Sequence, residues 1–185
     1  GSEMCIRDRA LYSYEEDNDV KVMLGTHVDD MTWAAKPGYD YIMEKILTLF
    51  DMRKIEEGEF RFCGREVSQD NEGNITVTCK STAEGILPIN FQIGKRSPED
   101  KATEGEIAQF RSVTGSVAWI SRQCRPALSY SSSRMQSIVP AAKVKNLTEA
   151  NKVVAEAKAG VEDGLFFKAK AFDWNKACLL YTSDA

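Results

Sequence analysis

Two adjacent aspartates, Asp29 and Asp30, are the residues of this 185-residue chain whose type and spacing point most directly to chemistry. They lie in the segment GTHVDDM, residues 25–31, where apolar residues on both sides predict a tight turn between two strands. Two carboxylates this close repel each other unless a cation neutralises them, and Mg²⁺ prefers such oxygen ligands together with substrate phosphates. The pair therefore indicates a magnesium site for phosphoryl transfer. A plain polar turn is the alternative, because aspartate is common in turns.

The elements around the pair are predicted to be a small sheet and a helix. Residues 11–14 and 20–24 are short β-type runs joined by the polar turn 15–19, which predicts a hairpin. A breaker, Lys36-Pro37-Gly38, precedes apolar positions that follow a 3.6-residue period over 39–52. We therefore expect an amphipathic helix packed on the sheet.

The next segments are predicted to be strands and then a connector. Residues 59–67 and 74–79 are strand-like runs joined by the turn 69–73. Residues 81–100 contain two prolines and little periodicity, so we expect a connector with one short helix.

The rest of the chain is predicted to be helical, so the fold class is α+β. Thr103 and Glu106 form an S/T-x-x-E capping box that begins a helix. Arg125-Pro126 ends it and begins the next. A second cap-like sequence, residues 146–149, begins a helix that continues to Gly160.

Charge divides the chain in the same way as the predicted elements. Residues 10–102 carry 11 basic and 18 acidic side chains, and residues 103–177 carry 11 basic and 7 acidic ones. The net charges of −7 and +4 leave the helical half able to follow a phosphate backbone. An ordinary solvated surface explains the same charges.

Composition excludes several classes of protein and site. Apolar runs are only a few residues long, so we expect no membrane span. One histidine, His27, excludes a multi-histidine metal site. The five cysteines are scattered without a C-x-x-C pair, which predicts reduced thiols in an intracellular, cytoplasmic protein that is not secreted.

Both ends of the chain resemble translated sequencing adapters. Residues 1–9 read GSEMCIRDR and residues 178–185 read CLLYTSDA, and their possible codons form inverted repeats. We therefore expect these ends not to be native and the biological part to span residues 10–177. Natural termini are the alternative.

Several segments, in order along the chain, resemble the reverse transcriptases of copia-type retrotransposons. The H-V-D-D turn is similar to the family's Y/F-V-D-D turn, and the helix at 39–52 lies where the family has its palm helix. Further resemblances are FRFCGREV (60–67) to F-L-G-I-E-I, FRSVTGSVAW (110–119) to Y-R-S-x-V-G-S-L-x-Y, RQCRPALSY (122–130) to T-R-P-D-I-A-Y, and 146–158 to the helix before RNase H. The match covers about residues 20–164.

The resemblance implies an internal fragment of a copia-type Pol polyprotein, whose parent is an RNA-directed DNA polymerase. Residues 10–80 would be a partial palm with the H-V-D-D turn and a primer-grip-like hairpin. Residues 81–160 would be a helical thumb and connection, and 161–177 the start of the link toward RNase H. The implied partners are an RNA template, a DNA primer, and the missing fingers, N-terminal palm and RNase H of the same polyprotein. The parent would act in a cytoplasmic virus-like particle.

The resemblance also implies roles for individual residues. Asp29 and Asp30 would be two of three catalytic carboxylates and would bind Mg²⁺, with His27 and Val28 next to the nucleotide. The residues implied to contact nucleic acid are Phe62, Cys63, Gly64 and Arg65 near the primer strand, and Arg111, Arg122 and Arg125 on the backbone. For each of these three arginines, bracing the helices is the structural alternative.

This sequence departs from the family at three positions. His27 stands where Tyr or Phe is usual, Cys63 replaces Leu, and Ala127 replaces the Asp of R-P-D. The third carboxylate would lie upstream, so we expect the chain alone to be inactive and its uncovered palm sheet to fold marginally. Two alternatives stay open: a decayed retroelement relic without activity, and an unrelated α+β binding module with an Asp-Asp turn.

Overall fold

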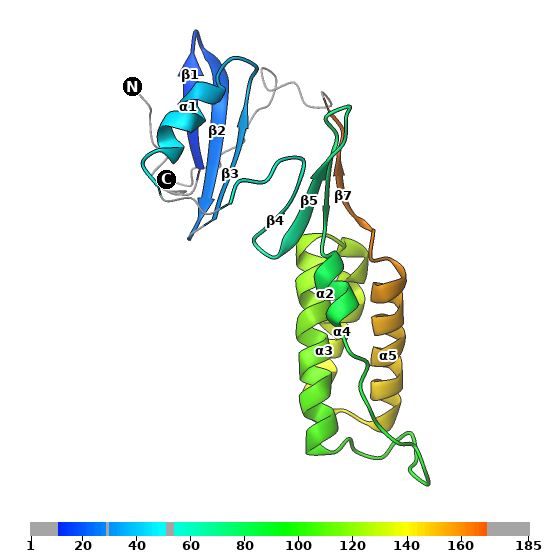
Figure 1. Ribbon diagram of the computed structural model, residues 1–185. Coiled ribbons are helices and arrows are strands. Elements are labelled where there is room, and N and C mark those ends of the chain that lie inside the picture. The colour runs from blue at the N-terminus through cyan, green and yellow to red at the C-terminus, as the bar shows by residue number, and fades with distance from the viewer. Residues whose placement is uncertain (1–10, 29, 51–53, 170–185) are drawn as a thin grey trace, which may run out of the picture. The chain divides into compact units, whose positions relative to one another are not determined.

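The structure is a computed structural model that describes residues 11–28, 30–50 and 54–169 (Figure 1). The chain divides into two compact units, Gly1–Glu57 and Gly58–Ala185. Each unit contains antiparallel strands and at least one helix, so the predicted α+β class is confirmed. The division lies within the segment 10–80 that the resemblance implied to be a partial palm. The expected adapter segments, 1–9 and 178–185, lie outside the described residues.

The first unit is a three-stranded antiparallel sheet with one helix. Strands β1 (Leu11–Glu16), β2 (Asp19–His27) and β3 (Asp30–Ala35) pair in the order β1-β2-β3. The predicted hairpin between β1 and β2 is confirmed, and Asp17 and Asn18 form its turn with positive φ angles of 54° and 57°. Asparagine and aspartate tolerate this left-handed conformation better than most residues.

Helix α1 (Asp40–Leu47) covers one face of this sheet (Figure 1). Its Met43 is 2% exposed and packs with Val22 and Leu24 of β2. The helix is shorter than predicted, because residues 48–50 form a turn instead, and residues 51–53 lie outside the described part.

The second unit begins with a four-stranded antiparallel sheet. Its strands β4 (Glu59–Phe62), β5 (Arg65–Gln69), β6 (Ile75–Thr78) and β7 (Gly164–Phe167) pair in the order β4-β5-β6-β7. The run 59–67, predicted from its pattern as one strand, is two strands. The turn between them is Cys63-Gly64, and both residues have positive φ, 49° and 74°. The hairpin that the resemblance implied is therefore present.

The helices of the second unit follow the sheet and form a bundle below it in Figure 1. They are α2 (Lys80–Gly85), α3 (Glu104–Gln123), α4 (Ser129–Ile138) and α5 (Val144–Ala159), with short 3₁₀ turns η1 (Pro126–Leu128) and η2 (Val139–Ala141) on either side of α4. Their core includes Phe110, Ile120, Leu128 and Leu147, each 1% exposed or less. α5 begins before the predicted cap at residue 146. Asn146 is instead its third residue, and its Oδ1 accepts from the backbone N–H of Lys143 at 2.9 Å.

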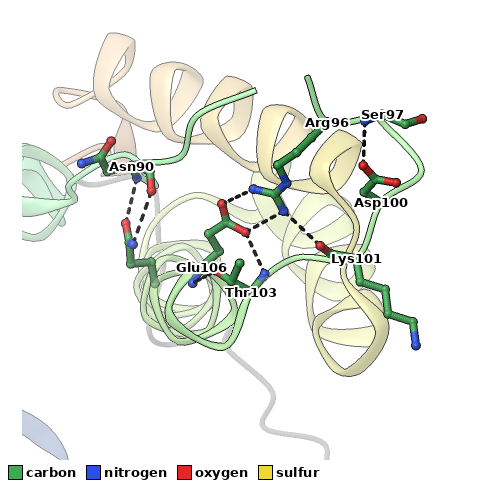
Figure 2. A network of polar contacts seen from close by, with 8 residues as sticks. Asn90, Arg96, Ser97, Asp100, Lys101, Thr103 and Glu106 are labelled. Carbon is green, nitrogen blue, oxygen red and sulfur yellow. Dashed lines mark hydrogen bonds and ion pairs between the residues drawn. The ribbon is translucent and has the colours of Figure 1, made fainter. Parts of the chain in front are cut away.

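Residues 86–103, which we call the strap, run along α3 and α5 and are fixed by side chains of both helices. Glu106, 7% exposed, accepts two bonds from the Arg96 guanidinium at 2.6 and 3.0 Å (Figure 2). It also accepts from the backbone N–H of Thr103 at 2.8 Å, which completes the predicted capping box. Nearby, the amide side chains of Gln109 and Asn151 pair with the backbone of Asn90 and Ile89.

Candidate functional site

The turn between β2 and β3 carries the residues that the sequence singled out. The two strands pair in continuous register from Val22 opposite Ala35 to His27 opposite Asp30. The predicted strand–turn–strand is therefore confirmed, and Asp30 is the first residue of β3. Asp29 lies outside the described residues. His27 and Asp30 are directly opposite each other, so their side chains share one face of the sheet.

That face is opposite α1. On β3, Met31, Trp33 and Ala35 pack into the core under the helix, so the residues alternating with them point the other way. On β2 and β3 the opposite face consists of Met23, Gly25, His27, Asp30, Thr32 and Ala34, and β1 adds Leu11 beside Gly25 and Ser13 beside Met23. Asp30 is exposed, and its neighbours on β3, Thr32 and Ala34, are small. The carboxylate of Asp30 is therefore accessible to solvent.

Val28, at the tip of this turn, has an unfavourable backbone conformation. Its φ is 54° and it is 89% exposed. A β-branched residue with positive φ is an outlier, and such conformations cost on the order of 1–3 kcal/mol and occur mainly at functional sites. Because Val28 buries almost nothing within the unit, its packing does not explain this cost. The hairpin itself does, because a two-residue loop between the paired residues His27 and Asp30 favours positive φ at its first residue.

A metal site at this turn would require both aspartates. Within the described ranges no group of three or more His, Cys, Asp and Glu side chains could hold a metal ion. Asp30 alone is therefore insufficient. A bound Mg²⁺ needs Asp29 and oxygens from a substrate as well, which is how this ion commonly binds nucleotides.

In the second unit, the turn of the β4–β5 hairpin lies against helix α3. A Cβ atom on Gly64 would lie 3.4 Å from Cζ2 of Trp119, so the indole packs against the turn. Phe62 and Arg65 are the last paired residues of the two strands, and both are half-buried, as is Cys63. Trp119 therefore brings the predicted primer-side residues next to α3.

An exposed face of α3 continues from this contact. Arg111, Gly115, Trp119 and Arg122, which we call the α3 stripe, are all exposed. At about 100° per residue they fall within roughly 80° of the helix circumference, and the two arginines are about 16 Å apart along the axis. The predicted contacts Arg111 and Arg122 therefore lie on the same side of the helix, with Trp119 and Gly115 between them.

Gly115 packs against no side chain among the residues that the structure describes. A Cβ at this position would have nothing within 4 Å. Glycine in a helix interior is less favourable than alanine by about 1 kcal/mol. Gly105 near the start of the same helix is equally open, so what makes Gly115 a candidate contact is its position between Arg111 and Trp119 on one exposed face.

Arg125, the third predicted arginine, is 9% exposed and braces α5. Its guanidinium donates to the carbonyls of Ala157 at 2.7 Å and Glu156 at 3.4 Å. It also lies 3.4 Å from Oδ2 of Asp163. These carbonyls are at the C-terminal end of α5, where unpaired carbonyls and the helix dipole favour a cation. The structure thus gives Arg125 the bracing role that the sequence left open.

Sequence reasoning did not single out Trp119 or Gly115 as functional residues. The available signal was their spacing of four and eight residues from Arg111, which places all three on one side of a helix. Which helix face is solvent-exposed could not be read from spacing alone, because it depends on how α4, α5 and the hairpin pack.

Comparisons with family models, curated proteins and solved structures find no match to this chain. Among the helices that the structure describes, none has both the length and the apolar composition needed to cross a membrane.

Proposed function

We propose that this chain is an internal piece of the Pol polyprotein of a copia-type retrotransposon. Its parent would be an intracellular reverse transcriptase that adds deoxynucleotides to a DNA primer on an RNA template. The observation that carries this proposal is the exposed Asp30, which begins β3 two residues after Val28 and lies opposite His27 on the sheet face away from α1. Support for a metal at this place is that Asp30 is exposed and that Thr32 and Ala34, its neighbours on the same face of β3, are small.

In the parent, Asp29 and Asp30 would hold Mg²⁺ against the phosphates of the incoming nucleotide. The metal would neutralise the developing charge of the phosphoryl transfer. Val28, at the tip of the turn, would lie next to the nucleotide. His27 would also be next to it, on the same sheet face as Asp30. The α3 stripe and the hairpin turn at Gly64 would contact the duplex through arginine charge and close backbone approach.

The chain alone is expected not to extend a primer, because the family's third carboxylate and fingers would lie upstream of the match. The metal site is therefore tested by binding. Mn²⁺, used in place of Mg²⁺, should selectively broaden the amide NMR signals of His27, Asp30 and Met31. The double variant Asp29→Asn/Asp30→Asn should lose this broadening.

The control for this experiment is Asp40→Asn. Asp40 is an exposed carboxylate in the first turn of α1, so its variant loses one charge of the same kind without touching the turn. It should keep the broadening. Absence of broadening in the unaltered chain, or equal broadening in the double variant, would contradict the proposed metal site.

The α3 stripe also supports a second candidate, a non-catalytic module that binds polyanions. Two exposed arginines beside an exposed tryptophan provide charge and an aromatic surface for a nucleic-acid strand. This candidate needs no metal at the β2–β3 turn. Nucleic-acid binding together with a negative Mn²⁺ result would therefore favour it over the polymerase fragment.

A further inference from the structure

Cys79 and Cys124 form a buried pair of thiols in the second unit. Cys79 is the N-cap of α2, directly after β6, and Cys124 is the C-cap of α3. Each is 2% exposed. The thiol of Cys79 donates a hydrogen bond to Sγ of Cys124, and the two sulfur atoms are 3.1 Å apart although the residues are 45 positions apart in sequence.

We propose that Cys79 and Cys124 are a latent disulfide that a peroxide oxidant closes in the folded protein. A disulfide bond is about 2.05 Å long, so the sulfur atoms need to approach by only about 1 Å. The surrounding core is close-packed and holds both side chains in place. This inference does not depend on the proposed function.

The oxidation balances with one molecule of hydrogen peroxide. The thiolate of one cysteine attacks a peroxide oxygen, an S–O bond forms, the O–O bond breaks, and the released hydroxide takes up the thiol proton as water. The sulfur of the second cysteine then attacks the sulfenic acid, an S–S bond forms, the S–O bond breaks, and a second water leaves. Two thiols are oxidised by two electrons in total and the peroxide is reduced.

Burial makes this reaction slow rather than impossible. Desolvation, followed by the contact with Cys124, raises the pKa of the Cys79 thiol to about 12. Little thiolate is therefore present near neutral pH, and the thiolate is the nucleophile. The pair should thus stay reduced under brief exposure and close under prolonged exposure or at higher pH. Once closed, the same burial protects the bond from reducing thiols.

The bond would join two parts of the unit that sequence does not connect closely. It would tie the end of β6 to the end of α3, the helix that carries the α3 stripe. Cys124 is followed directly by Arg125, which braces α5. The disulfide would therefore link the sheet covalently to α3, next to the residue that braces α5. Unfolding that separates the sheet from the bundle would then require more free energy.

The test uses the full chain with Cys5, Cys63 and Cys178 changed to serine, so that only the pair remains. After prolonged treatment with hydrogen peroxide, the intact mass should fall by two hydrogen atoms, and a protease digest should contain the 79 and 124 peptides linked. The Tm should rise by roughly 5 °C or more, and dithiothreitol applied after unfolding should reverse both changes.

The matched control adds Cys124→Ala to the same background, which keeps the site apolar. It should show no mass loss and no rise in Tm, and circular dichroism before oxidation checks that it folds. If the paired chain gains oxygen atoms without forming the linked peptide, or keeps both thiols after prolonged peroxide at pH 9, the proposal is overturned. The same holds if linkage appears only after the chain is unfolded.

Discussion

At the scale of single residues, the backbone angle of Val28 lowers the stability of the fold, whereas the paired carboxylate of Glu106 contributes to it. Val28 holds an unfavourable backbone angle while 89% exposed, whereas Glu106 is 7% exposed and fully engaged by Arg96 and Thr103. The first is a residue whose conformation serves the turn rather than the core. The second is a charge whose burial depends on its partners.

Val28→Gly should therefore stabilise the first unit. Glycine adopts positive φ without steric penalty, whereas an L-residue in this region is disfavoured by about 1–2 kcal/mol. After subtracting the greater freedom of glycine in the unfolded chain, we expect a gain of about 0.5–1 kcal/mol in urea unfolding. Val22→Gly, at a buried position with ordinary φ in β2, is the control and should destabilise. Loss of stability in Val28→Gly would mean that the strain is absent.

Glu106 should give the second unit a dependence on pH. The Arg96 guanidinium and then the Thr103 bonds hold the pKa of this carboxyl at about 2, below its unfolded value near 4.3. A lowered folded pKa contributes stability that is complete above the unfolded pKa and is lost as pH falls toward about 2. Urea midpoints at pH 3 and pH 6 should therefore differ less in Glu106→Gln than in the unaltered chain. An unchanged difference would contradict this role.

At the scale of elements, two glycines should respond to alanine in opposite ways. Gly115→Ala should stabilise α3 by about 1 kcal/mol, because the new Cβ meets nothing within 4 Å. Gly164→Ala should destabilise β7, because its Cβ would lie 2.2 Å from the carbonyl oxygen of Val77. The Tm of each variant, measured by thermal unfolding, should be higher than that of the unaltered chain for Gly115→Ala and lower for Gly164→Ala. A destabilised Gly115→Ala would show that α3 needs this glycine for its own packing.

The elements that the sequence predicted well are those with local signals. The capping box at Thr103 and Glu106 begins α3 as expected, and Pro126 marks the start of the next helical segment. The turn at Cys63-Gly64 was missed by pattern, because the run 59–67 was predicted as one strand although its alternation breaks at Gly64, with Phe60 and Phe62 at even positions before it and Val67 at an odd position after it. β7 was missed because its pairing with β6 is a contact between segments more than 80 residues apart, which no local pattern contains.

The candidate site was predictable only in part for the same reason. The turn that carries Asp30 follows from the apolar residues around it, and the structure has the predicted strands on either side. The sequence did not predict that Trp119 belongs to the candidate site. That follows from its contact with Gly64, which lies in the β4–β5 turn far from it in sequence. Arg125 and Arg122 look alike in sequence, and only packing separates the buried brace from the exposed side chain.

At the scale of the whole molecule, the two units differ in how much core each contains. Among the described residues, the first unit buries only Val22, Leu24 and Met43 in its cluster, whereas the cluster of the second unit has eighteen buried members. Apolar burial is the main stabilising contribution to a fold. The first unit is therefore expected to be marginal on its own, in line with the sequence-based expectation for its sheet.

Unfolding of the full chain should accordingly occur in two steps. The first step should remove the NMR dispersion of residues 11–50 at low urea, and the second should unfold the α3–α5 bundle cooperatively at higher urea. A peptide covering 58–169 should reproduce the second step, since its sheet closes with β7 and its core is its own. A single transition, in which the signals of both units change at the same urea concentration, would contradict this division.

The proposed function requires the α3 stripe to contact a primer–template duplex, and the most direct test of that contact is the affinity of Gly115→Ala for an RNA–DNA hybrid. The substitution changes no charge, so binding to a general polyanion surface should be unaffected. If the α3 stripe fits the duplex closely, Gly115→Ala should lower the affinity several-fold while leaving its salt dependence unchanged, and Arg111→Ala should reduce that dependence. Unaltered affinity in Gly115→Ala, or no binding of the hybrid at low salt by the unaltered chain, would contradict the proposed contact.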